Sequence, residues 1–442
     1  MDTSLNFELT SPALKRLMAE LESLDIAQTQ FPLAITVPAS EIEPWSLLNA
    51  NPNLPRVCWS ERDSVSSIFG LGSAASVEME AGGDAADCFA QCQQLLNGNT
   101  QLRCYGGFSF DGSAHWKTFG AGLFVIPRIV LSENKLTLAV MDAEDIERCR
   151  QELTQLNIDS QPLNSRLPTP VEKIYQPTFD GWQSRIDEAL SLIRAEALEK
   201  IVLSRKAKLR FAEALDPIAL TARLSVSTHD CFVFCFDFGD ESAFVGATPE
   251  RLFFREGNRL YSEVVAGTRV RGENSEADEL LAKELLNSDK DQREHDIVRK
   301  SIRQKLHKFV EHLEVDSQAS ILRLAKKQHL RSNVCGTLKD GVDDGMLLNR
   351  LHPTPAVGGY PTDNALPEIA RIEPFSRGWY AAPVGWIGGE DSQFAVAIRS
   401  GLVSGRTLTL YSGAGIVRGS DPDEEWQEIE NKIQDYMDVL GH

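Results

Sequence analysis

The pattern of hydrophobic and polar positions predicts alternating blocks of helix and strand. Near the N-terminus, apolar side chains recur at helical spacing and predict an amphipathic helix within residues 1–30, with an apolar face of Leu14, Leu17, Met18, Leu21 and Leu24. Similar spacing predicts helices over residues 85–96 and 145–156. Short apolar or alternating runs predict strands over residues 33–37, 56–59, 66–71, 102–110, 122–130 and 136–141, the last two forming a hairpin around Ser132-Glu133-Asn134.

The second half of the chain continues this alternation. Residues 182–198 have the spacing of an amphipathic helix, and residues 276–312 form a long charged helical region with a predicted break near Asn287-Ser288. Strand patterns with tight turns cover residues 200–211, 231–238, 243–247, 252–255, 259–265, 381–387, 394–399 and 407–411. Runs of consecutive strands separated by blocks of helix are typical of an α+β fold, not of repeated βαβ units.

A proline-rich segment is the best candidate for an internal boundary. Residues 160–177 include prolines at positions 162, 168, 170 and 177, and such a concentration is typical of a loop or linker. We therefore divide the chain into an N-terminal region, residues 1–174, and a C-terminal region, residues 175–442.

Composition narrows the class of protein. Hydrophobic residues make up 42% of the 442-residue chain and charged residues 25%, as in soluble globular proteins. No apolar run reaches the roughly 18 residues that a membrane-spanning helix needs, and the N-terminal sequence lacks the basic-then-apolar pattern of a signal peptide. We therefore expect a cytoplasmic protein. The eight cysteines form no CxxC pair, and we expect buried free thiols.

The net charge bears on the partners of the protein. Lys and Arg number 45 against 64 Asp and Glu, which gives a formal charge of −19. This excess of acidic groups argues against nucleic acid or an anionic membrane as the main partner. An anionic small molecule would need locally clustered basic groups or a divalent cation to bind.

One stretch near the C-terminus, residues 413–432, combines a flexible loop with an acidic helix start. It reads GAGIVRGSDPDEEWQEIENK. Ser420 or Asp421 can cap the helix, because both side chains accept hydrogen bonds from free backbone N–H groups. Glu425 and Glu428 share one helix face, and Lys432 lies one turn beyond Glu428. These groups could hold a hard cation beside an anionic ligand, although a solvated acidic helix start has the same pattern.

Other candidate groups come from acid–base and metal chemistry, since no Walker loop, GxGxxG, GxSxG or HExxH motif is present. Lys200 begins an apolar strand and is either an exposed edge charge or, if buried, a general base. Glu250 follows a proline in a turn and is either a surface acid or an enclosed proton donor. Thr268 follows Gly267 at a strand end, where close approach to a ligand is possible. Asp291 and Glu294 form either a solvated helix face or part of a metal site.

Several segments keep an order that is typical of one protein family. They are EKIVLSR, GATPERL, VVAGTR, DKDQREH, KQHL, HPTPAVGG, EPFSRGWYAAPVGW, AIRS and the GAGIVRGSDPDEEWQEIENK stretch. Over roughly residues 175–436 the chain resembles the chorismate-utilising enzymes, and within them the menaquinone-type isochorismate synthases. The resemblance implies a single large α/β unit in which helices flank two packed antiparallel sheets.

The resemblance also implies roles for individual residues. Lys200 matches the general base that activates water for attack at C2 of chorismate, and Glu250 matches the general acid that protonates the departing C4 hydroxyl. Glu294 and Glu428 match ligands of Mg²⁺, and Glu425 matches a member of the same carboxylate shell. The positions that match contacts to the substrate or to the metal shell are Thr268, His329, Tyr380, Arg399, Gly415 and Lys432.

Two positions distinguish activities within the family. Relatives that transfer an amino group through a covalent lysine carry it where this chain has Ala266, and relatives that expel pyruvate often have threonine where this chain has Ala356. Both residues favour an isomerase that forms isochorismate. A salicylate-forming lyase and a non-catalytic, magnesium-dependent chorismate binder are the alternatives. Family members of this type are often monomeric, so we expect a monomer.

Overall fold

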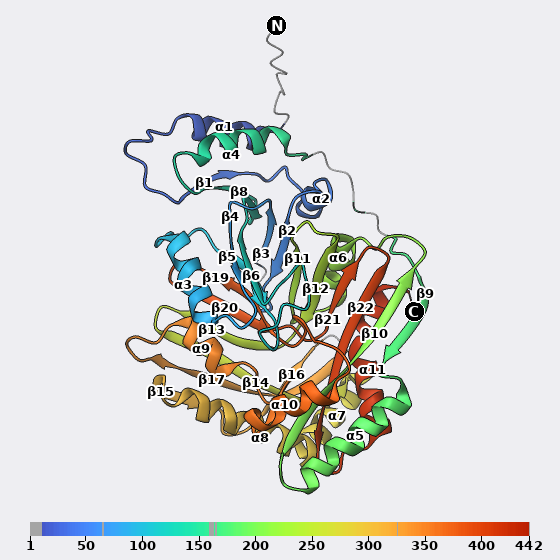
Figure 1. Cartoon of the computed structure of the whole chain (residues 1–442). Helices are drawn as coiled ribbons and strands as arrows, with labels where there is room; N and C mark the ends of the chain where they lie inside the picture. Colours follow the sequence, from blue (N-terminus) through green and yellow to red (C-terminus); the bar gives the residue numbers. More distant parts are fainter. Residues whose placement is uncertain (1–10, 64–65, 159–162, 164–165, 325, 442) are drawn as a thin grey trace.

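Two large antiparallel sheets form the centre of the fold (Figure 1). The structure is a computed structural model and describes residues 11–63, 66–158, 163, 166–324 and 326–441. Within these residues the fold is α+β, with helices flanking the two sheets, as the sequence predicts.

The larger sheet has 12 strands drawn from both halves of the chain. In spatial order they are β1 (Leu33–Pro38), β8 (Lys135–Val140), β7 (Ile129–Ser132), β3 (Ser67–Leu71), β2 (Arg56–Ser60), β11 (Phe232–Asp237), β12 (Ser242–Thr248), β21 (Ser400–Ser404), β22 (Thr407–Val417), β10 (Lys200–Phe211) and β18 (Gly359–Tyr360), with β9 (Pro170–Gln176) pairing β10 off this path.

The second sheet has ten strands. In spatial order they are β15 (Val310–Val315), β17 (Lys327–Leu338), β14 (Arg259–Val270), β13 (Arg251–Glu256), β20 (Asp391–Val396), β19 (Pro383–Ile387), β5 (Cys104–Phe108), β6 (Gly122–Ile126) and β4 (Ala75–Met79), with β16 (Ser320–Arg323) pairing β17. An aromatic cluster fills the space between the two sheets, with Trp59, Phe232 and Phe234 from one side and Tyr105 and Trp386 from the other. Aromatic side chains bury large areas and therefore stabilise this contact strongly.

The helices cover the outer faces and the ends of the sheets (Figure 1). They are α1 (Pro12–Glu22), α2 (Pro44–Asn49), α3 (Ala85–Leu96), α4 (Asp145–Gln155), α5 (Phe179–Arg194), α6 (Pro217–Ser227), α7 (Ser275–Asn287), α8 (Asp289–Leu306), α9 (Asp344–Leu351), α10 (Thr362–Ile372) and α11 (Pro422–Val439). Helices α5, α10 and α11 share one apolar cluster with β10 and β22. This cluster fixes the start of β10 and the middle of α11, on which the candidate site depends.

The N-terminal and C-terminal regions pair with each other in both sheets. In the larger sheet β2 pairs with β11, so that Cys58 lies opposite Cys235. In the smaller sheet β5 pairs with β19, so that Tyr105 lies opposite Trp386. Backbone hydrogen bonds therefore cross from one region to the other at the centre of each sheet. Residues 159–162, 164 and 165 of the proposed boundary segment lie outside the described residues.

Several predicted bounds differ by a few residues, such as those of β22 and β14, which are longer than predicted, and two predictions also assign the wrong element. The strand predicted over residues 122–130 is two strands, because the chain leaves the smaller sheet after Ile126 and enters the larger sheet at Ile129. Pro127, between them, has no N–H to continue a ladder. The helix predicted to extend to residue 312 ends at Leu306. The residues after it form β15, which pairs with β17 and buries Val310. The predicted break near Ser288 is confirmed, since Ser288 caps α8.

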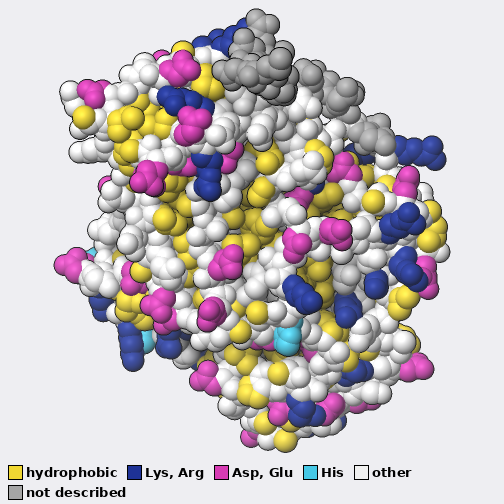
Figure 2. Space-filling view, turned by 45° about the horizontal axis from the view of Figure 1, so that its top comes forward, with side chains coloured by type: hydrophobic (Ala, Val, Ile, Leu, Met, Phe, Trp, Pro, Cys, Tyr) yellow, Lys and Arg dark blue, Asp and Glu magenta, His cyan; other side chains and the backbone are white. Residues whose placement is uncertain are grey.

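The surface carries both signs of charge. Acidic and basic side chains are interspersed on the face shown in Figure 2, around apolar areas near its centre. Among the described residues, none of the helices combines the length and the apolar character that crossing a bilayer requires.

Candidate active site

One cavity collects most of the residues that the sequence singles out. Strands of both sheets, α8 and α11 supply its walls. The lining residues are Val202, Pro249, Glu250, Val265, Ala266, Gly267, Thr268, Glu294, His329, Ala356, Val357, Arg377, Tyr380, Ala381, Ile398, Arg399, Tyr411, Ser412, Gly413, Glu428 and Lys432. Residues separated by more than 200 positions thus meet at one place.

Lys200 is not part of this lining but contacts Glu294, which is. It is the first residue of β10 and is fully buried, and its Nζ atom lies 2.8 Å from Oε1 of Glu294. Strand β22 pairs with β10 and places Gly415 opposite Val202. A Cβ atom at Gly415 would lie 2.6 Å from Oε1 of Glu294 and 2.8 Å from Cε of Lys200. The glycine leaves room for the Lys200–Glu294 pair, because a side chain here would displace the ends of both residues.

Glu250 occupies the turn between β12 and β13, where the chain passes from one sheet to the other. Its carbonyl accepts from the amide of Val396 at 3.0 Å, and its own amide donates to Oγ1 of Thr248 at 3.3 Å. Burial, with a smaller contribution from the nearby Glu263 carboxylate, raises the pKa of Glu250 to about 8. The Glu250 carboxyl is therefore mostly protonated at neutral pH and can donate a proton.

A polar group of three residues, Thr268, His329 and Arg399, forms another part of the wall. Strand pairing sets Thr268 of β14 opposite His329 of β17. Burial and then the Arg399 guanidinium hold the pKa of His329 well below its usual value, so the imidazole is neutral. Its Nδ1 atom donates to the Gly267 carbonyl at 2.9 Å, and its Nε2 atom accepts from Nη2 of Arg399 at 2.7 Å. His329 thus orients Arg399 without cancelling its charge.

Two carboxylates on separate helices complete the site. Glu294 lies on α8 and Glu428 on α11, and both line the cavity. Oε1 of Glu428 lies 2.7 Å from Nζ of Lys432, which also donates to the Gly413 carbonyl at 2.8 Å. Although burial opposes ionisation of Glu428, the Lys432 ammonium outweighs it and lowers the pKa of this carboxyl. Glu428 is therefore available as an anionic oxygen ligand, and Glu294 presents a second carboxyl group to the same cavity.

The carboxylates that the sequence groups together have different ion-pair partners in the structure. Glu425 is buried away from the cavity lining and pairs with Lys290 at 2.9 Å. Asp291 pairs with Arg269 at 2.9 Å. In the part of the chain that the structure describes, no three His, Cys, Asp or Glu side chains gather as a metal-binding group. Glu294 and Glu428 still fit Mg²⁺, because this ion is bound through one or two carboxylates, retained waters and oxygens of the substrate.

The remaining wall includes residues that sequence reasoning missed. Tyr380, which it found, stacks on Tyr411 with ring centroids 5.2 Å apart. Tyr411 lies in an alternating strand, and its spacing carries no sign of a site. Arg377 is buried in an ion pair with Glu373 and donates to the carbonyls of Val202 and Val357. Its position within the EPFSRGWYAAPVGW segment was the one available signal.

Comparisons with known proteins agree with the resemblance. A family model described as chorismate binding enzyme matches residues 19–441. The chloroplastic isochorismate synthase of Catharanthus roseus is 34% identical over 414 residues, which cover 88% of this chain and 71% of that protein. The isochorismate synthase MenF of Bacillus subtilis is 32% identical over 417 residues, covering 87% and 88% respectively.

The fold matches a solved structure over nearly the whole chain. The menaquinone-specific isochorismate synthase MenF from Escherichia coli superposes with a TM-score of 0.86 at 32% sequence identity, over 97% of this chain and 99% of that one. The similarity includes the N-terminal region, for which sequence motifs carried little information.

Proposed function

The chain belongs to the family of chorismate binding enzymes, and on this premise we propose that it is an isomerase, an isochorismate synthase that converts chorismate to isochorismate. The observation that carries the proposal is the proximity of a buried lysine, Lys200, to a glutamic acid, Glu250, that lines the cavity and is mostly protonated at neutral pH. Lys200 and Glu250 are close enough that the Lys200 charge acts on the Glu250 carboxyl. The carboxyl groups of Glu294 and Glu428 and the cationic side chains of Arg399 and Lys432 line the same cavity.

The proposed reaction moves a hydroxyl group between two ring carbons. Lys200 acts in its neutral amine form: it takes a proton from a water molecule and becomes an ammonium, and the oxygen of that water bonds to C2 of chorismate. The ring double bonds shift, the C4–O bond breaks, and Glu250 protonates the departing hydroxyl, which leaves as water. One water enters and one leaves, so there is no net redox change. The raised pKa of Glu250 supports its part, because a general acid must hold its proton at the working pH.

Charge complementarity supports the substrate. Chorismate carries two carboxylates, and the net charge of the chain, −19, would repel it unless the site differs locally. Arg399 and Lys432 line the cavity and can bind a carboxylate, Arg399 through two parallel hydrogen bonds. We propose that Glu294 and Glu428 hold Mg²⁺ there. The ion, when bound, offsets the charge of a substrate carboxylate. Thr268, His329, Tyr380 and Gly415 are proposed to shape the surrounding walls.

Ala356, which lines the cavity, favours an enzyme that releases isochorismate over one that expels pyruvate. Pyruvate elimination needs the enolpyruvyl group held over the ring, and an alanine has no hydroxyl with which to hold it. Release of isochorismate follows. The name of one relative, the menaquinone-specific isochorismate synthase MenF from Escherichia coli, favours menaquinone biosynthesis as the destination of the product.

Product analysis of the purified protein with chorismate and Mg²⁺ tests this proposal. We expect isochorismate in a reversible mixture with chorismate. Stoichiometric formation of salicylate and pyruvate would show that the protein is a lyase and not an isomerase. Binding of chorismate without conversion would indicate a non-catalytic chorismate binder.

A further inference from the structure

A buried ion pair lies beside the proposed general acid. Arg62 follows β2 in the N-terminal region, and Glu263 lies on β14 in the C-terminal region. The two side chains are each 3% exposed and meet through two parallel contacts, Nη1 to Oε1 at 2.5 Å and Nη2 to Oε2 at 3.1 Å. Such a two-pronged arrangement fixes the relative orientation of both groups.

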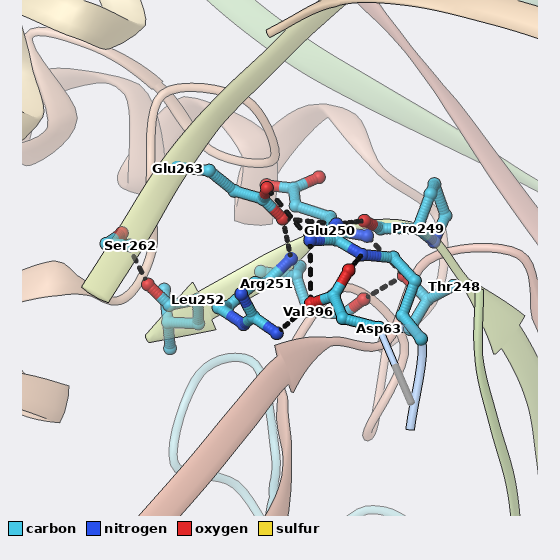
Figure 3. A network of polar contacts seen from close by, with 10 residues as sticks. Asp63, Thr248, Pro249, Glu250, Arg251, Leu252, Ser262, Glu263 and Val396 are labelled. Carbon is cyan, nitrogen blue, oxygen red and sulfur yellow. Dashed lines mark hydrogen bonds and ion pairs between the residues drawn. The ribbon is translucent and has the colours of Figure 1, made fainter. Parts of the chain in front are cut away.

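The same ion pair binds the peptide groups on both sides of Glu250. Nη1 of Arg62 donates to the carbonyl of Pro249 at 2.5 Å. The amide of Arg251 donates to Oε1 of Glu263 at 3.0 Å. Figure 3 shows Glu263 above the Pro249–Arg251 turn, with its carboxylate directed at that turn and close to Glu250. The residue before Glu250 and the residue after it are therefore each held by one partner of the pair.

Further residues contact the Arg62–Glu263 pair and the Arg251 side chain next to it. Nε of Arg62 donates to Oδ1 of Asp63 at 3.0 Å, and the Arg251 side chain binds the other oxygen of Asp63. Both guanidinium groups also lie near the face of the Phe232 ring, at 5.4 Å and 5.5 Å from its centroid. Placing the Arg62 and Glu263 charges in the interior costs desolvation free energy, and a buried ion pair contributes little net stability. Stability alone does not account for the arrangement.

We propose that Arg62 and Glu263 are positioning residues, which together clamp the turn that carries Glu250 and aim its carboxyl into the cavity. The inference rests on the proposed role of Glu250 as general acid. It also gives the N-terminal region a part in catalysis, because Arg62 comes from that region. Neither side chain lines the cavity, so both act through Glu250.

The clamp also bears on the proton affinity of Glu250. The charged groups that act on this carboxyl come from four elements: Glu263 on β14, Lys200 on β10, Lys432 on α11, and Arg399 in the loop before β21. After burial, Glu263 is the largest influence and raises the pKa, whereas the three cations lower it. Arg62 neutralises Glu263. Removing the Glu263 charge therefore lowers the pKa of Glu250. Removing Arg62 leaves the Glu263 charge unopposed and raises the pKa of Glu250.

The test compares Glu263→Gln and Arg62→Ala with a matched control, Asp237→Asn. Asp237 forms a similarly buried ion pair with Arg56 of β2 but lies outside the cavity lining. Because a small misplacement of a catalytic group is costly, we expect kcat to fall about 10²-fold in both test variants with KM for chorismate nearly unchanged. The alkaline fall in activity should move to lower pH in Glu263→Gln and to higher pH in Arg62→Ala. The control should keep its kcat and its pH profile.

Two results would overturn the clamp: kcat values equal to that of the control, or a loss of kcat with both pH profiles unmoved, which is the pattern of a purely structural pair. Thermal unfolding checks that each variant is folded, and if Arg62→Ala is not, the isosteric Glu263→Gln carries the test. Failure of the proposed function is seen separately, as a wild-type protein that makes no isochorismate or a Glu250→Gln variant with full activity.

Discussion

Lys200 and Glu294 form an ion pair that joins the start of β10 to α8, with Nζ and Oε1 2.8 Å apart. The residues are 94 positions apart in the chain, and Lys200 is fully buried whereas the Glu294 side chain is 18% exposed. The proposed base thus contacts a proposed metal ligand that lines the cavity. The two proposed functions, proton transfer and cation binding, are therefore coupled through one contact.

The first prediction concerns the base. Lys200→Ala should lower kcat by about 10²- to 10⁴-fold, the usual contribution of a positioned general base. Steady-state rates of isochorismate formation measure this. Lys208→Ala, on the exposed face of the same strand, is the matched control and should be unaffected. Near-wild-type turnover of Lys200→Ala would show that the base has been misassigned.

The second prediction concerns the acid and its pH dependence. Glu250→Gln should lose a similar factor of about 10²–10⁴ in kcat. In the wild type, Glu250 must be protonated to act, so activity should fall as pH rises through about 8. A wild-type alkaline limb that the folded Glu250→Gln variant reproduces would exclude Glu250 as its source.

The third prediction concerns stability at the same residue. Because the pKa of Glu250 is raised from 4.5 to about 8 on folding, the folded state holds the proton more tightly than the unfolded state. The stabilising contribution of that proton is full below about pH 4.5 and is lost as pH rises through about 8. The unfolding free energies of the wild type and of Glu250→Gln should therefore diverge between about pH 4.5 and 8 and stay apart above pH 8, with the variant relatively more stable there. Parallel pH profiles of stability would contradict the raised pKa.

The fourth prediction concerns the metal. Glu294→Gln and Glu428→Gln should leave the fold intact, abolish activity at ordinary Mg²⁺ concentrations and weaken Mg²⁺ binding measured by calorimetry. Glu424→Gln, at an exposed position of the same helix as Glu428, is the control. Full activity of the wild type in EDTA would remove the role of magnesium.

The fifth prediction concerns the product. Ala356→Thr adds a hydroxyl to the cavity wall, and we expect a larger fraction of pyruvate with some loss of isomerase rate through crowding. Ala381→Ser, elsewhere on the same wall, adds a hydroxyl at a different place and controls for polarity alone. An equal pyruvate fraction in both variants would mean that position 356 does not decide the product.

Local pattern determined much of the secondary structure. The helix predicted over residues 85–96 and the strand predicted over residues 200–211 have those bounds in the structure, because apolar spacing and caps act within a few residues. The order of short motifs likewise identified Lys200, Glu250, Glu294 and Glu428 as members of one candidate site.

Tertiary structure decided what those residues contact. Sheet pairing sets Gly415 against the Lys200–Glu294 pair, and the strand between residues 122 and 130 divides because its two halves find partners in different sheets. Glu425 and Glu428 share a helix face, yet one pairs with Lys290 and the other with Lys432. Arg62 meets Glu263 across 201 positions. The spacing of residues along the chain does not predict such contacts, because they depend on how distant segments pack and on which charged side chains are buried together.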